Sequence, residues 1–182
     1  MSVNIYQIHI QTNSLDEVKA SLADWLSHTH KEETVIYENQ DSAIQFFHNK
    51  IPSLFAVSTI NEKWISILHD AYEPPFDLAN TLSASFECTV IQLMGQSTVD
   101  TYSLSVHEKG SIIRKMTYGE ESIGLEQEGD PFPFEPSLWQ EDEEHHFFDY
   151  EDMNNFCSHF GIEILTDPSE KDGEWTIIKV RK

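Results

Sequence analysis

Short apolar runs separated by turn residues constrain this chain more than any other feature. VNIYQIHI, from Val3 to Ile10, alternates apolar and polar side chains with the period of a half-buried strand. CTVIQLM (88–94) is almost continuously apolar, as in a strand buried on both faces. Helical spacing of apolar residues occurs in 15–28, after Pro74-Pro75 and after Asp149. The sequence therefore predicts an α+β fold, a largely antiparallel sheet with helices packed on one face.

The order strand, helix, strand, strand occurs twice, from Val3 to His48 and from Trp64 to His107. Thr-Val-Ile stands at the corresponding place in each copy. A duplicated strand-helix-strand-strand unit is one interpretation. The other is that any strand favours these three residue types.

The chain divides in composition near residue 128. We expect residues 1–128 to form an α+β core, and 129–182 to pack on it as an acidic segment in the order loop, helix, strand, strand. The two predicted strands are IEIL (162–165) and WTIIKV (175–180). The closing KVRK supplies charges suited to guarding a sheet edge.

Acidity is concentrated in the last third of the 182 residues. The net charge is -21, and from Met116 to Glu170 there are 16 of the 32 acidic residues and no lysine or arginine. Such a field opposes binding to nucleic acid and to anionic membranes, and it speeds the encounter with basic proteins. The alternative is that the acidity serves only to keep the protein in solution.

Location and redox state follow from what the sequence lacks. No apolar run approaches the roughly 20 residues that span a bilayer, and the first residues show no secretory signal. The two cysteines, Cys88 and Cys157, form no CxxC pair. We therefore expect a cytoplasmic protein with free thiols.

The middle of the chain carries a resemblance. The segments KWISILHD, LANTLSASF, TVIQL and DTYSLSVHEKG, within residues 63–117, resemble a pattern seen in small uncharacterised acidic bacterial cytosolic proteins. The resemblance rests on Trp64, Leu82, Ser83, Tyr102 and Gly110. It implies a similar fold and no particular activity. Members of that group often have acidic residues before the tyrosine strand, where this chain has GQSTV.

Strong catalytic signatures are missing from the sequence. There is no phosphate-binding GxxxxGK[ST] or GxGxxG, no GxSxG and no HExxH. We therefore expect no cofactor, and an enzymatic role is the less favoured class.

Two helix starts have capping signals, and the last helix also settles the position of one cysteine. Ser14 and Glu17 have the spacing of a capping box, and Asp149 is a good N-cap. After Asp149, Cys157 falls on the apolar stripe, while His159 projects about 200° around the axis. These two side chains cannot bind one ion together, so Cys157 is predicted to be buried.

The acidic run QEDEEHHFFDYED (140–152) holds the remaining candidates. His145 and His146, with nearby carboxylates, could bind a transition metal in a loop and support a metal-dependent hydrolase. They could instead form a protonation switch near pH 6. No known metal motif has this spacing.

The leading hypothesis is a non-enzymatic binding protein that docks a basic protein partner through this region. Small acidic immunity-type proteins that neutralise basic toxins provide an analogy in charge and size. The predicted steering groups are Glu141, Asp142, Glu143 and Glu144, and the predicted aromatic anchors are Phe132, Phe134 and Trp139. A third possibility is an oligomeric structural protein whose Pro- and Phe-rich loop packs against a second copy.

Overall fold

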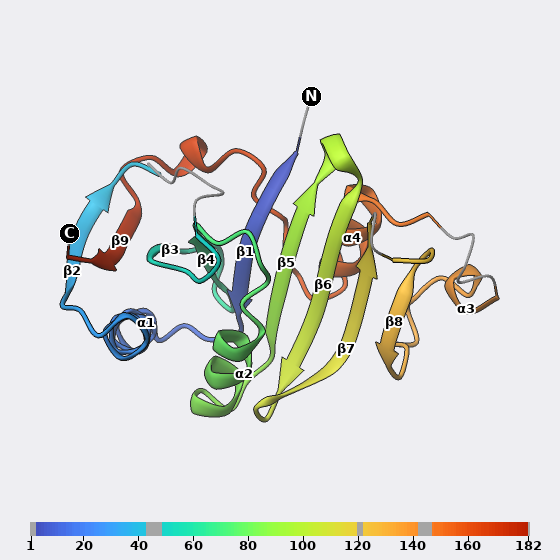
Figure 1. Ribbon diagram of the computed structural model, residues 1–182, viewed down its shortest axis with the longest axis horizontal. Helices are drawn as coiled ribbons and strands as arrows, with labels where there is room; N and C mark the ends of the chain where they lie inside the picture. Colours follow the sequence, from blue (N-terminus) through green and yellow to red (C-terminus); the bar gives the residue numbers. More distant parts are fainter. Residues whose placement is uncertain (1–2, 43–48, 120–121, 142–146, 182) are drawn as a thin grey trace.

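The computed structural model describes residues 3–42, 49–119, 122–141 and 147–181. Nine strands form one sheet in the order β2-β9-β3-β4-β1-β5-β6-β7-β8, and every neighbouring pair is antiparallel (Figure 1). The strands are β1 Asn4–Ile10, β2 Thr34–Gln40, β3 Leu54–Thr59, β4 Ile65–His69, β5 Val90–Gln96, β6 Thr101–Glu108, β7 Ser111–Tyr118, β8 Glu126–Gly129 and β9 Trp175–Val180. The helices are α1 Leu15–His30, α2 Phe76–Ser85, α3 Leu138–Glu141 and α4 Tyr150–Ser158.

The predicted class is confirmed, because helices pack on a largely antiparallel sheet, and the structure refines where they lie. Side chains of β1 alternate between two cores, since neighbouring residues of a strand point to opposite faces. Ile8 and Ile10 pack with apolar residues of α1 and α2. Ile5 belongs to the other core, which contains Met153, Phe156 and Cys157 of α4. Helices therefore cover both faces, with α1 and α2 on one and α4 on the other.

The C-terminal segment contributes an interior strand, β9, to the sheet. β9 pairs with β2 on one side and with β3 on the other. The expectation that KVRK guards a sheet edge is therefore wrong, because the edge strand is β2, which lies beyond it. The predicted strand 162–165 is also wrong. Ile162 and Ile164 are buried on the α4 face, but the segment crosses that face and joins no strand ladder.

The two units of the suggested duplication are placed differently in the sheet. β9, β3 and β4 separate β1 from β2, whereas β1 alone separates β4 from β5. Residues 43–48, predicted as the last strand of the first unit, lie outside the described residues. The duplication stays a prediction.

The capping predictions had different outcomes. At α4, the Asp149 carboxylate accepts from the backbone N–H of Asp152, and the reciprocal bond is present as well. At α1, Ser14 makes no side-chain capping bond, and the Thr12 hydroxyl accepts from the Ser14 N–H.

Among the described residues, no helix is both long and apolar enough to cross a membrane.

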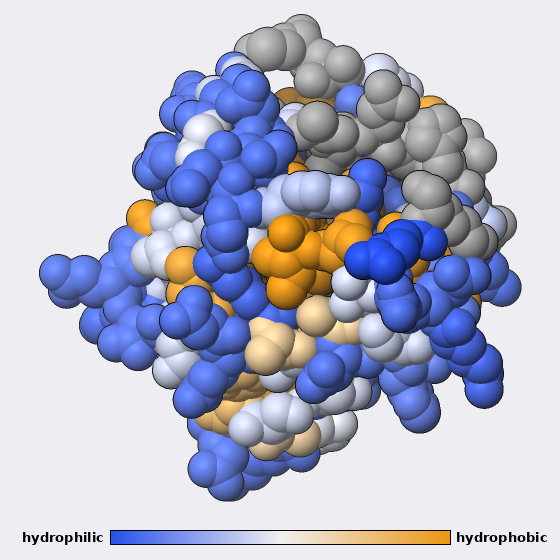
Figure 2. Space-filling view, turned by 90° about the vertical axis from the view of Figure 1, so that its left-hand side faces the viewer, coloured by the Kyte–Doolittle hydropathy of each residue, from blue (hydrophilic) through white to orange (hydrophobic). Residues whose placement is uncertain are grey.

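One edge of the sheet is apolar where it meets solvent. Figure 2 faces the end of the molecule that carries β2 and shows an apolar patch ringed by polar surface. Ile36 and Tyr37 of β2 are 46% and 47% exposed. At the opposite edge, β8 instead presents the exposed carboxylates of Glu126 and Glu128.

Three histidines are fully buried in the sheet. Both ring nitrogens of His9 and the Nε2 atom of His69 have no hydrogen-bond partner among the described residues. His107 is hydrogen-bonded on both ring nitrogens. Burial lowers the pKa of each of the three side chains to about 4. All three are therefore neutral at pH 7.

We predict that the three buried histidines make the folded protein less stable as the pH falls. An unfolded histidine has a pKa near 6.5, so the unfolded chain binds more protons than the folded one between about pH 6.5 and 4. The stability from the neutral rings is complete above pH 6.5 and is lost as the pH falls towards 4. His9→Leu should reduce the proton uptake on unfolding near pH 5 by about one, measured from denaturant titrations at several pH values.

The matched control is His28→Gln on the exposed surface of α1, which should leave that pH dependence unchanged. The change in carboxylate repulsion with pH is common to both variants and cancels in the comparison. An unaltered slope in His9→Leu would contradict this account of the buried ring.

Candidate functional site

The structure describes only part of the predicted partner-binding set. Asp142, Glu143 and Glu144 lie outside the described residues, as do His145 and His146. Glu141 is exposed at the end of α3. Phe132 and Phe134 are half-buried, and Trp139 is 2% exposed. The three predicted aromatic anchors are therefore engaged within the fold in this conformation.

An aromatic cluster attaches the Pro–Phe loop, residues 130–137, to α4. The rings of Phe132 and Phe134 stack at 5.3 Å, and both pack edge-to-face against Phe156 and Phe160. The exposed His159 ring stacks on Phe134 at 4.2 Å. Edge-to-face and offset pairs of this kind are favoured by the ring quadrupoles. The loop packs through its rings as its sequence suggests, and its partner is this chain's own helix.

A buried ion pair attaches the same loop to the sheet. The Arg114 guanidinium on β7 donates two hydrogen bonds to the Glu135 carboxylate, 3.0 Å from Nε and 2.5 Å from Nη2. Both side chains are 1% exposed. The remaining Arg114 donors reach the carbonyls of Glu128 and Gly129 and the side chain of Gln127. A planar bidentate fork with every donor satisfied is the arrangement in which arginine can be buried.

Glycine is required where β8 leads into this loop. Gly129 has φ +82, and a Cβ at that position would lie 2.0 Å from the carbonyl oxygen of Ile113. The close approach also places the Gly129 carbonyl 3.1 Å from Arg114. The ion pair and the turn therefore stabilise one another.

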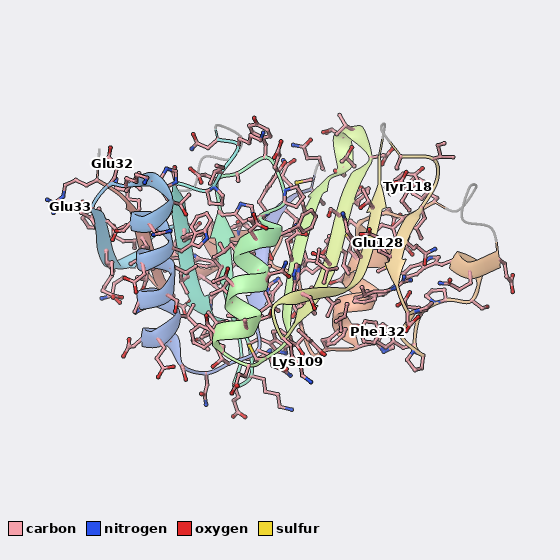
Figure 3. The ribbon with its side chains drawn as sticks, turned by 60° about the horizontal axis from the view of Figure 1, so that its bottom comes forward. Glu32, Glu33, Lys109, Tyr118, Glu128 and Phe132 are labelled. Carbon is pink, nitrogen blue, oxygen red and sulfur yellow. The ribbon has the colours of Figure 1, made fainter. Side chains whose placement is uncertain are left out.

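What remains on the outside is a surface that we call the acidic edge. It consists of the exposed side chains around β8, α3 and the start of α4: Glu126, Glu128, Asp130, Glu141, Glu151, Leu138 and Phe147. Leu138 is 61% exposed and Phe147 is 48% exposed. Figure 3 shows Glu128 and Tyr118 at the same end of the sheet, on opposite faces: Glu128 lies beside Lys115 on the α2 face, and Tyr118 packs against the core on the α4 face. The Tyr118 ring meets Phe147 at 5.3 Å.

Few cations offset the charge of the acidic edge. Arg114 is buried and engaged with Glu135. Lys115 lies 3.5 Å from Glu128, and its ammonium group also sits 4.6 Å above the Phe76 ring. The next lysine after Lys115 in the chain is Lys171. Among the described residues, the negative charge of this surface is therefore largely uncompensated.

Two apolar contacts of the site were missed by reasoning from the sequence. Leu138 and Phe147 are each adjacent to a buried aromatic neighbour, Trp139 and Phe148, whose rings meet at 5.4 Å. Adjacent side chains diverge on a helix and alternate on an extended chain, so one member of each pair has to face outward. The doublets LW and FF were the available signal, but they do not say which member is buried.

A buried polar chain on the opposite face of the sheet was not predicted either. The Ser105 hydroxyl donates to Gln92 at 3.0 Å and lies 2.8 Å from Nε2 of His107. Nδ1 of His107 is 2.6 Å from the Asn80 side-chain oxygen on α2. The order serine, histidine, asparagine is that of a hydrolytic triad. Ser105 and His107 are both fully buried, however, so a substrate has no approach to the hydroxyl, and the network serves to hold α2 on the sheet.

His69 and Asp70 are likewise structural. The Asp70 carboxylate accepts from the Ser53 and Leu54 N–H groups, the Ser53 hydroxyl and the Asn49 side chain. It organises the turn before β3. Nδ1 of His69 accepts from the Ala71 N–H.

Within the described part of the chain, no three His, Cys, Asp or Glu side chains are close enough to hold a metal ion. Cys157 is buried as predicted, and burial raises the pKa of its thiol. The residues of the metal hypothesis, His145 and His146, lie outside this search.

Comparison with known proteins adds no further information on the site. No protein-family model matches the chain, and no curated protein or solved structure matches it significantly.

We predict that substitutions at Arg114 and Glu135 have strongly non-additive effects on the free energy of unfolding. Arg114→Met leaves the Glu135 carboxylate buried without its cation and should lower the free energy of unfolding by about 3–5 kcal/mol. Adding Glu135→Gln removes that charge and should restore at least half of the loss. Denaturant titration of both variants measures this.

The control is the neighbouring Lys115→Met, which breaks a partly exposed pair and should cost below about 1 kcal/mol. Equal losses in Lys115→Met and Arg114→Met would show that the buried pair contributes no more than a surface contact.

Proposed function

We propose that this protein is a non-enzymatic cytoplasmic binding protein that docks a basic protein partner on the acidic edge. One observation carries the proposal: exposed carboxylates and exposed apolar side chains occur at the same end of the sheet, where the described part of the chain supplies few cations. The proposal retains Glu141 and the neighbouring 142–144 as steering groups.

Electrostatic steering accounts for the role of the carboxylates. Rim charges change mainly the association rate, and they act over about a Debye length, roughly 10 Å at 0.1 M salt. The exposed Glu126, Glu128 and Glu141 would raise the local concentration of a basic partner. Because cations within the chain compensate few of these charges, the effect should be sensitive to salt.

The apolar members of the acidic edge would provide affinity. Interfaces depend mostly on a few buried apolar or aromatic anchors. Leu138 and Phe147 are free to be covered by a partner, whereas Trp139 supports them from beneath. Phe132 and Phe134 would act indirectly, by holding the loop and α3 in place. The anchor role predicted for Phe132, Phe134 and Trp139 is thereby assigned to the exposed Leu138 and Phe147.

The analogy with small acidic immunity-type proteins remains one of charge and size. It suggests a basic toxin as one form that the partner could take. The acidic edge contains no feature specific to that class.

The test compares two doubly neutralised variants of the full chain. Glu126→Gln/Glu141→Gln alters the acidic edge, and Asp24→Asn/Glu62→Gln removes the same charge from α1 and the β3–β4 turn. Each variant captures proteins from native lysate at low salt, and a basic protein held by the wild type is identified and purified. Its association rate should fall several-fold for the first variant at low salt and stay near the wild-type value for the second.

Leu138→Ser provides a separate measure of the apolar anchor. It should weaken binding of the same partner by roughly tenfold, mainly through faster dissociation. Equal binding by both neutralised variants, or binding that strengthens with salt, would contradict docking on the acidic edge.

A further inference from the structure

The outer edge of β2 presents unpaired backbone groups. The Arg181 N–H donates to the Glu33 carbonyl at 2.7 Å, so Glu33 forms a hydrogen-bonded pair with β9. Such pairs recur at every second residue of an antiparallel ladder. Val35 and Tyr37 therefore bond to β9, while the N–H and C=O groups of Thr34 and Ile36 point away from it. No strand among the described residues pairs with that side.

Over residues 34–37 the edge also lacks the usual protection against pairing. Proline, inward-pointing charge or a charged edge face normally blunts an exposed strand. Residues 34–37 read Thr-Val-Ile-Tyr, and Ile36 and Tyr37 are about half exposed. A register shift between Tyr37 and Gln40, with Asn39 at φ 54, ends the regular part of the strand.

Charge is balanced locally at this edge, in contrast to the rest of the molecule. Glu33 pairs with Arg181 at 2.7 Å, and Glu38 pairs with Lys19 at 3.0 Å. The Lys179 ammonium group lies 5.6 Å from the Tyr37 ring. The formal charges of residues 31–41 and of the cations that contact them sum to zero. The positive charges are Lys19, Lys31, Lys179 and Arg181, and the negative charges are Glu32, Glu33, Glu38 and Asp41. The whole chain carries -21.

We propose that two copies of this chain pair through β2, antiparallel about a two-fold axis at Ile36. Thr34 then lies opposite Glu38 of the second copy, Val35 opposite Tyr37, and Ile36 opposite its own counterpart. Val–Tyr is a favourable cross-strand pair, and the threonine hydroxyl can donate to the carboxylate. Moving the axis to Val35 would place Glu32 opposite Glu38, a like-charge pair that disfavours that register.

The helices leave room for this arrangement. α1 packs across β9 and its two neighbours β2 and β3, so it is centred about one strand in from the edge. With strands about 4.8 Å apart, the α1 axis lies roughly 7 Å from the two-fold axis. The two α1 axes would then be about 14 Å apart, beyond the 8–10 Å of packed helices.

A second copy fits this edge better than the basic partner does. The β2 edge has no net charge to attract a cationic surface, and its sequence complements itself. The acidic edge lies at the opposite end of the sheet order, and in Figure 3 Glu32 and Glu33 lie far from Glu128. Pairing through β2 would keep the two acidic edges apart. Because the contact spans only a few residues, the dimer should be weak.

The experiment is sedimentation velocity on the full chain from about 5 to 500 µM, the range in which small interfaces associate. It is run at about 50 and 500 mM NaCl, where the Debye length is roughly 14 and 4 Å. The dimer fraction should rise with concentration and with salt, since salt screens repulsion between the two chains. Ile36→Lys should raise the dissociation constant at least tenfold.

Two further variants distinguish edge pairing from other effects. Ile123→Lys places the same charge at a 76% exposed apolar residue near β8 and should leave the dimer unchanged. Thr34→Pro removes an outward-facing N–H while keeping the bonds to β9, so it should weaken the dimer without lowering the melting temperature greatly. A chain that stays monomeric throughout, dissociates with salt, or responds equally to both lysine variants would overturn the proposal.

Discussion

The buried ion pair between Arg114 and Glu135 is the interaction on which the C-terminal third depends. From Met116 to Glu170 the chain has no cation of its own, so a carboxylate buried there has to be neutralised from elsewhere. Arg114 does this from β7, just before the acidic stretch begins. By holding Glu135 against the sheet, it places the Pro–Phe loop over α4, and the aromatic cluster and α3 follow from that position.

Local structure could be predicted from the sequence where one segment contains all the information. The period-two run of β1 and the helix after Asp149 were identified correctly, because alternation and capping are properties of neighbouring residues. The position of β9 could not be obtained in this way. Its pairing with β2 and β3 joins residues more than a hundred positions apart. Residues 162–165 show the same limit, since their strand-like alternation reflects one buried side and involves no ladder.

Composition indicated the acidic stretch as a candidate site, but it could not predict which side chains of that stretch are exposed. The absence of lysine and arginine marked the acidic stretch, and Glu141 is exposed as a steering group should be. On the single turn of α3, Trp139 is buried and its neighbour Leu138 faces outward. That choice depends on Phe148 and the sheet, which no local pattern contains. The same reasoning applies to the Ser105–His107–Asn80 chain, where triad-like order occurs without access to the hydroxyl.

Net charge acts in opposite senses at the two edges of the sheet. At β8, uncompensated carboxylates would attract a basic partner and repel a second copy, so salt should weaken the proposed docking there. At β2, ion pairs within the chain cancel the local charge, and salt should strengthen pairing by reducing repulsion between distant acidic groups. A strongly charged chain associates with itself most readily where its own cations neutralise the surface. In this protein Lys19, Lys179 and Arg181 lie beside β2, which favours that edge for the proposed pairing with a second copy.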